Sequence, residues 1–213
     1  MILTGAVFFL KPQATIRTQD DQQQKPNTQV FSQTEQAPKP AETSAPLIAT
    51  PEEIALQRKM QILKEVFATH NDNDPRLDQD FNQLTEAEKA KLEQLYRETP
   101  AEKLNERGIL VLILARNLES EKDFHFIDEL FREPVCLSLS DCRRPPSTQT
   151  DEHGELSSAV TLNYPQLVAL EKLKEWPEHH VSAKEKTKSA WRNSVNEAQH
   201  SRSEVVAREA RKL

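Results

Sequence analysis

Apolar side chains recur at helical spacing after several helix-start signals along this chain. Thr50 suits the N-cap position and Pro51 the first turn of a helix whose apolar face extends to His70. Thr85 with Glu88 fits the capping box, in which each side chain bonds the backbone N–H of the other residue. Both patterns predict amphipathic helices, and a polar run separates them.

The most apolar stretch is Ile-Leu-Val-Leu-Ile-Leu-Ala at residues 109–115. A segment that is apolar on every side must be buried on every side, and seven residues are too few to cross a membrane. Its β-branched residues also suit a buried strand. Thr99 and Pro100 with Glu102 repeat the helix-start signal just before it, so we interpret the stretch as the central helix of a domain.

Two further helices are predicted beyond this point. A capping signal at Ser120 opens the first, and Pro134 stops it. The second begins at Tyr164 and ends before Pro177. Between them, residues 134–163 show little periodicity and form an unusually long predicted loop, of a kind that is functional or disordered.

Composition divides the chain into four segments. Residues 1–12 are an apolar N-terminal segment, and residues 13–49 are a linker rich in Gln, Thr, Pro, Ala and Ser that is predicted to be disordered. Residues 50–176 form the helical domain, and residues 177–213 form a charged, marginally helical tail. The N-terminal segment resembles the end of a membrane anchor or export signal; the alternative is an apolar end that packs on the domain or frays.

The predicted fold is all-α, with five or six helices forming an irregular helical bundle or a short α-solenoid-like stack of antiparallel helix pairs. Residues 112–118, a short polar turn and residues 123–131 resemble the passage between consecutive HEAT-type repeats, in which a buried helix is followed by a turn and an amphipathic helix. This resemblance extends over roughly residues 84–176. It implies a binding or scaffolding role, since stacked helix pairs present extended surfaces.

Composition and charge exclude some classes of function. The chain has three glycines, too dispersed for the glycine loops of Rossmann and P-loop nucleotide sites. The formal net charge is −6; residues 177–213 carry eight basic and five acidic groups, whereas the helical domain is strongly acidic. An acidic centre with a weakly basic tail does not favour nucleic-acid binding. No residues form a credible catalytic or cofactor site.

Cys136 and Cys142 are the only cysteines, and they flank a five-residue segment. A disulfide is the natural interpretation in an exported protein, and two free thiols in a cytosolic one. A metal site would need two further ligands, of which His153 offers at most one. A catalytic cysteine paired with His125 or His153 has no motif to support it.

Two other groups of residues are weaker candidates. The acidic cluster Asp72, Asp74, Asp78 and Asp80 departs from the EF-hand pattern at three positions, which favours an acidic turn. In the tail, Trp191 and Val195 lie on a thin apolar line that could dock on a partner as an amphipathic helix. Packing within the domain, or a lack of stable order, is the alternative.

The favoured function is a non-enzymatic interaction or scaffold domain that binds another protein, tethered to or exported across a membrane. The expected location is the periplasmic face of a bacterial inner membrane, with the cytoplasm as the alternative. Two other functions stay open. One is a thiol or redox protein that uses the Cys136–Cys142 loop, and the other is a cytosolic helical regulator that binds an acidic partner through its basic tail.

Overall fold

A computed structural model describes residues 50–145 and 155–213, with the backbone alone for residues 155–158. These residues are all-helical, as the sequence pattern predicts, and neither described range contains a strand. The helices are α1 (Pro51–Thr69), α2 (Arg76–Gln79), α3 (Glu86–Glu98), α4 (Leu104–Arg116), α5 (Glu121–Arg132), α6 (Glu155–Leu162), α7 (Tyr164–His179), α8 (Glu185–Gln199) and α9 (Glu204–Ala210).

The predicted capping interactions are present at the first two long helices. At α1, the Thr50 N–H donates to the Glu53 carboxylate at 2.7 Å and the Glu53 N–H to the Thr50 hydroxyl at 3.2 Å. At α3, the same pair of bonds joins Thr85 and Glu88. His70 ends α1 in the left-handed conformation, with φ of 52°. Local chemistry therefore sets these helix starts.

The start signal at Thr99 is wrong. Thr99 instead ends α3, because its hydroxyl donates to the Leu95 carbonyl at 2.7 Å and its N–H bonds to the same carbonyl. The Lys103 N–H donates to the Pro100 carbonyl in a turn, and α4 begins only at Leu104. The central segment is nevertheless helical, and the strand alternative is excluded.

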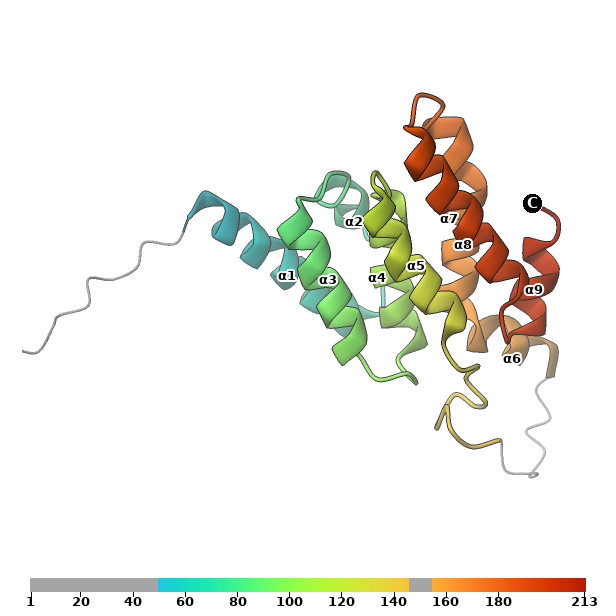
Figure 1. The fold of residues 1–213 in the computed structure, drawn as a ribbon. Helices are drawn as coiled ribbons and strands as arrows, with labels where there is room; N and C mark the ends of the chain where they lie inside the picture. The colour runs from blue at the N-terminus through green and yellow to red at the C-terminus, as the bar shows by residue number, and fades with distance from the viewer. Residues whose placement is uncertain (1–49, 146–154) are drawn as a thin grey trace, which may run out of the picture. The chain divides into compact units, whose positions relative to one another are not determined.

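The helices form two layers (Figure 1). In one layer α3, α5 and α8 lie side by side and run in the same direction. Ion pairs and hydrogen bonds show this, because they join residues at corresponding positions along neighbouring helices. Those pairs are Lys122–Glu86, Arg97–Glu129, Ser194–Asp128 and Arg132–Glu197. In the other layer α4 and α7 pack closely. Helices that lie next to each other in a layer are thus two or three places apart in the chain order.

Helix α4 lies at the centre of the core. Its residues Ile109, Leu110, Val111 and Ile113 are at most 1% exposed. The end of α4 runs back toward the start of α3, where the Asn117 amide donates to the Phe81 carbonyl at 2.9 Å. Burial of large apolar side chains at about 1.5–3 kcal/mol each makes α4 the element around which the others are stabilised.

The predicted boundary at residue 176 is wrong, and so is the prediction of a marginal tail. Helix α7 continues through Pro177 to His179. A proline has no N–H to donate to the carbonyl four residues earlier, here that of Leu173. The indole N–H of Trp191 on α8 donates to this carbonyl instead, at 2.8 Å. Helices α8 and α9 are therefore part of the folded domain.

Other boundaries also differ from the prediction. Residues 155–162, placed by the sequence in the long loop 134–163, form α6. The short helix α2 is likewise not predicted from the sequence. The apolar segment 1–12 and the linker 13–49 lie outside the described residues. In the part of the chain that is described, no helix is long and apolar enough to cross a membrane.

Candidate functional site

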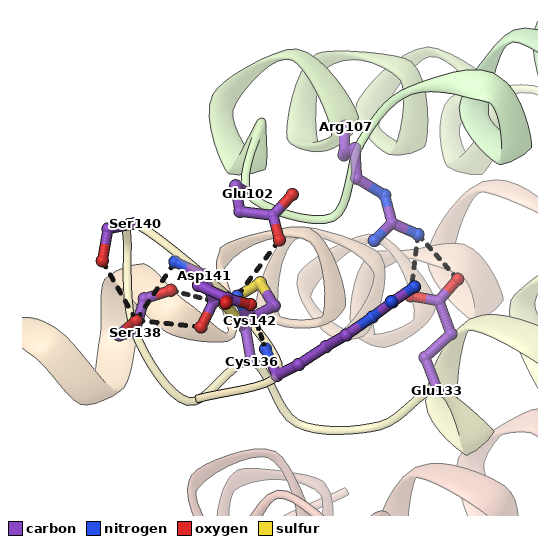
Figure 2. The surroundings of a disulfide bond; sticks show 9 residues. Glu102, Arg107, Glu133, Cys136, Ser138, Ser140, Asp141 and Cys142 are labelled. Carbon is purple, nitrogen blue, oxygen red and sulfur yellow. Dashed lines mark hydrogen bonds and ion pairs between the residues drawn. A yellow bond between two sulfur atoms is a disulfide. The ribbon is translucent and has the colours of Figure 1, made fainter. Parts of the chain in front are cut away.

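The two cysteines close a loop that follows α5. The sulfur atoms of Cys136 and Cys142 are bonded at 2.04 Å, so the metal and free-thiol interpretations of this pair do not apply. The Leu137 N–H donates to the Cys142 carbonyl, and the Ser138 hydroxyl bonds both the N–H and the carbonyl of Asp141. The disulfide and these hydrogen bonds hold residues 136–142, which we call the disulfide loop, in one conformation (Figure 2).

The turn before α4 anchors the disulfide loop. The Cys142 N–H donates to the Glu102 carboxylate at 3.2 Å, across a separation of 40 residues. Hydrogen bonds from the Glu102 and Cys142 backbone, with the charges of Arg143 and Arg107, hold the pKa of Glu102 below its usual range. Glu102 therefore remains an ionised acceptor through the neutral and mildly acidic range.

In the disulfide loop, apolar side chains are exposed and a polar side chain between them is buried. The apolar side chains of Leu137 and Leu139 are 45% and 58% exposed, whereas Ser138 between them is 9% exposed. Cys136 is also buried, at 7%. Apolar groups on a constrained loop cannot turn inward to escape water. Leu137 and Leu139 thus form a small exposed apolar surface on the disulfide loop.

A cavity of about 430 Å³ lies beside the disulfide. The ends of α3 and α5 and the starts of α4 and α7 contribute its lining, together with both cysteines. Its apolar residues include Leu104, Val135 and Leu162, and its charged residues include Arg107, Glu133 and Arg143. This volume is in the range of small-ligand pockets, roughly 300–1,000 Å³.

Arg107 is the most constrained charged group at this cavity. One terminal nitrogen donates to both carboxylate oxygens of Glu133, at 2.7 and 2.8 Å, and the guanidinium lies 4.0 Å from the centre of the Tyr96 ring. The Tyr96 hydroxyl also donates to Glu133. Burial, and then the Glu133 charge, raises the pKa of Tyr96 far above its usual value. The ring therefore stays neutral and the Glu133 carboxylate stays paired.

The predicted docking residues Trp191 and Val195 are not on a free surface. The Trp191 ring stacks near the Trp176 ring, with centroids 6.2 Å apart, and Val195 is 9% exposed. Both side chains pack within the domain, because α8 covers α5 and α7. These two residues stabilise the fold and do not form a docking face.

Other candidate residues are dispersed. His125 lies 3.4 Å from Glu129 on the surface of α5, away from the lining of the cysteine cavity, and His153 lies outside the described residues. In the acidic cluster, Asp74, Asp78 and Asp80 each pair with an arginine of the chain. Among the described residues no group of three or more His, Cys, Asp or Glu side chains could hold a metal ion.

A second hollow, of about 510 Å³, lies between the first turns of α5 and α8. At its edge Asp128 accepts a hydrogen bond from the Ser194 hydroxyl. Burial raises the pKa of Asp128 above its usual range, against the effects of Ser194 and Arg132. Asp128 therefore links α5 to α8 by accepting this hydrogen bond. The lining of the hollow contains both acidic and basic side chains.

Sequence reasoning did not find Arg107 or Asn163 as residues of the site. Arg107 stands at an ordinary helical position, Asn163 lies in the predicted long loop 134–163, and no motif marks either residue. The signal is tertiary, because the two residues line one cavity only when α4 and α7 pack together. No protein-family model, curated protein or solved structure matches this chain. The function is therefore inferred from the chain's own residues.

Proposed function

We propose that this chain is a non-enzymatic interaction domain that binds another protein through its disulfide loop. The observation that carries the proposal is the exposure of Leu137 and Leu139 on a loop held by a disulfide and several hydrogen bonds. A preorganised loop loses little conformational entropy on binding, so more of the apolar contact energy contributes to affinity. The HEAT-type resemblance of residues 84–176 supports the same class of function.

The disulfide also supports a location in an oxidising compartment, such as the periplasmic face of a bacterial inner membrane. Disulfides persist in exported proteins and are reduced in most cytosolic ones. A cytosolic regulator that acts through a free basic tail has less support, since α8 and α9 of that tail pack on α5 and α7. Two of its basic side chains, Arg192 and Lys212, also pair with Glu185 and Glu209 of the tail itself.

Site-specific photo-crosslinking in the native host tests the docking proposal. A photoreactive amino acid at Leu139 is expected to give a discrete protein adduct, whereas the same group at Val181 gives none. Val181 is the matched control because it is an apolar residue and 75% exposed. Excess purified chain should suppress the adduct, and excess Leu137→Asp/Leu139→Asp chain should not. Equal adducts at both positions, or suppression by both competitors, would contradict docking through the loop.

The redox function is the second candidate, because Cys142 is only partly buried and lines the cavity. The variant Cys136→Ser/Cys142→Ser separates it from docking. If the loop docks, the Leu139 adduct persists with reduced yield, since hydrogen bonds still hold part of the loop. If the chain exchanges electrons with a partner dithiol, the interaction is lost together with oxidation of that dithiol.

A further inference from the structure

The two cysteines of the disulfide differ in their access to solvent. Cys136 is buried, at 7% exposure, whereas Cys142 is only partly buried, and both line the cavity of about 430 Å³. A thiolate opens a disulfide by attacking one of the two sulfur atoms, and access helps to decide which sulfur is attacked. Cys142 is therefore the more open target for a thiolate that comes from outside the domain.

The surroundings of Cys136 suit the sulfur that leaves. Its Sγ lies 3.1 Å from the carbonyl oxygen of Ser138. In the disulfide this sulfur carries no hydrogen, but a free Cys136 thiol can donate its S–H to this carbonyl without moving. A neutral thiol is a poor nucleophile, because the thiolate is the reactive form. The reduced loop is therefore slow to close again by attack from Cys136.

Opening of the disulfide changes the loop and leaves the core in place. Cys136 is buried but does not belong to the large apolar cluster that the helices form. The hydrogen bonds between Leu137 and Cys142 and between Ser138 and Asp141 join residues of the same short segment. Such bonds compete with bonds to water and are weak on their own. Without the covalent bond, the loop therefore has access to other conformations.

We propose that the disulfide is a thiol-exchange site, opened by attack on Cys142, through which a dithiol regulates docking by the loop. One thiolate bonds to the Cys142 sulfur, the S–S bond breaks, and the electron pair leaves on Cys136, which takes a proton from water. The second thiolate attacks the dithiol's own bonded sulfur and frees Cys142, which is protonated in turn. The dithiol leaves as a disulfide, and two electrons have passed to the chain.

The consequence for docking follows from preorganisation. The oxidised loop holds the exposed side chains of Leu137 and Leu139 in one arrangement, and the reduced loop does not. Ordering the reduced loop on binding costs conformational entropy, so the same contacts give a lower affinity. This inference rests on the proposed docking function and names the regulation of that site.

Trapping of the mixed disulfide tests which sulfur is attacked. The oxidised full-length chain is treated briefly with reduced glutathione, free thiols are blocked with N-ethylmaleimide, and both groups are located by tandem mass spectrometry. Glutathione is expected on Cys142 and the maleimide on Cys136. A mixed disulfide on Cys136, or equal amounts on the two cysteines, would overturn the proposal.

The same reaction in concentrated urea is the matched control. In the unfolded chain both sulfur atoms are open to solvent, so glutathione should bond to Cys136 and Cys142 in comparable amounts. A preference for Cys142 that persists unchanged in urea would come from neighbouring residues in the sequence. That result would refute the argument from burial.

Hydrogen exchange measures what reduction does to the loop. With dithiothreitol as the reductant, the Leu137 N–H, which donates to the Cys142 carbonyl, should exchange on the order of tenfold faster than in the oxidised chain. The N–H of Leu110, a fully buried residue of α4, should exchange at an unchanged rate. Unchanged exchange at Leu137, or equal acceleration at both positions, would refute a switch confined to the loop.

Competition for the Leu139 photo-adduct separates regulation from docking. The variant Cys136→Ser/Cys142→Ser represents the reduced loop, and on the order of tenfold more of it than of oxidised chain should be needed to suppress the adduct. Equal suppression by the two competitors would refute the regulation and leave docking through the loop intact. Absence of the adduct in the oxidised chain would refute docking itself, while the trapped mixed disulfide still identifies the sulfur that is attacked.

Discussion

At the scale of single residues, one glycine decides how α4 and α7 approach each other. Gly108 lies in the middle of a buried helix, where glycine costs about 1 kcal/mol relative to alanine. A Cβ at this position would lie 2.2 Å from Cε1 and 2.5 Å from Cδ1 of Tyr164. The tyrosine ring therefore packs directly on the α4 backbone, and the same contact brings the start of α7 to the cavity.

Gly108→Ala is expected to lower the free energy of unfolding by about 1–3 kcal/mol, because the new methyl group overlaps the Tyr164 ring. In a Tyr164→Ala background the same change should become stabilising, by about 1 kcal/mol, since only helix propensity remains. Urea unfolding of the four proteins of this double-mutant cycle measures both values. A change of the same sign in both backgrounds would contradict the packing described here.

At residue scale, too, Pro177 and Trp191 form a compensating pair. Proline removes the N–H that would bond the Leu173 carbonyl, and the Trp191 indole replaces it. A proline in a helical pattern reads as a stop signal, so the sequence alone predicted an end at Trp176. The replacement donor comes from another helix, and nothing in the local pattern indicates it.

At the scale of elements, a buried ion pair joins α3 to α5. The Lys89 ammonium donates to both carboxylate oxygens of Asp123, at 3.1 and 3.0 Å, and the side chains are 5% and 6% exposed. Asp123 also accepts from the N–H groups of Glu119 and Ser120 at the start of α5. Asp123, which completes the capping box of α5 with Ser120, thus also sets the position of α5 against α3.

Lys89→Met is expected to destabilise the domain by about 3–5 kcal/mol, because it leaves the Asp123 carboxylate buried without its cation. Lys122→Met, one residue from Asp123, is the matched control. Lys122 pairs with Glu86 between side chains that are 70% and 58% exposed, so its loss should cost at most about 1 kcal/mol. Chemical denaturation compares the two, and similar costs would show that the Lys89 pair is not important for docking α5.

At the scale of the whole described domain, the last helices cover the apolar faces of α5 and α7. Phe124 and Trp176 meet edge to face between α5 and α7, with ring centroids 5.4 Å apart. Helix α8 then covers this contact with Trp191 and Val195, and α9 packs on α8 and α7. The tail predicted as marginal therefore closes the end of the stack.

Truncation after Val181 tests the role of the last two helices. Removal of α8 and α9 should expose the apolar face of α5 and α7, so the truncated chain is expected to bind a hydrophobic dye and to lose its cooperative unfolding transition. Truncation after Ala210, which removes three exposed residues, is the control and should leave both unchanged. Cooperative unfolding after truncation at Val181 would show that the tail is a separable arm.

The sequence by itself determined what depends on near neighbours in the chain. Caps at Thr50 and Thr85 and the apolar period of α4 are local, because helix starts and faces follow from residues three or four apart. Tertiary structure alone decided the rest. It joined Cys136 to Cys142 in a disulfide, where the sequence left three outcomes open. It placed the Trp191 indole against the Leu173 carbonyl, which Pro177 leaves without a backbone donor. It also brought Arg107 and Asn163 to the lining of one cavity. These depend on contacts between residues distant in sequence, which no local pattern encodes.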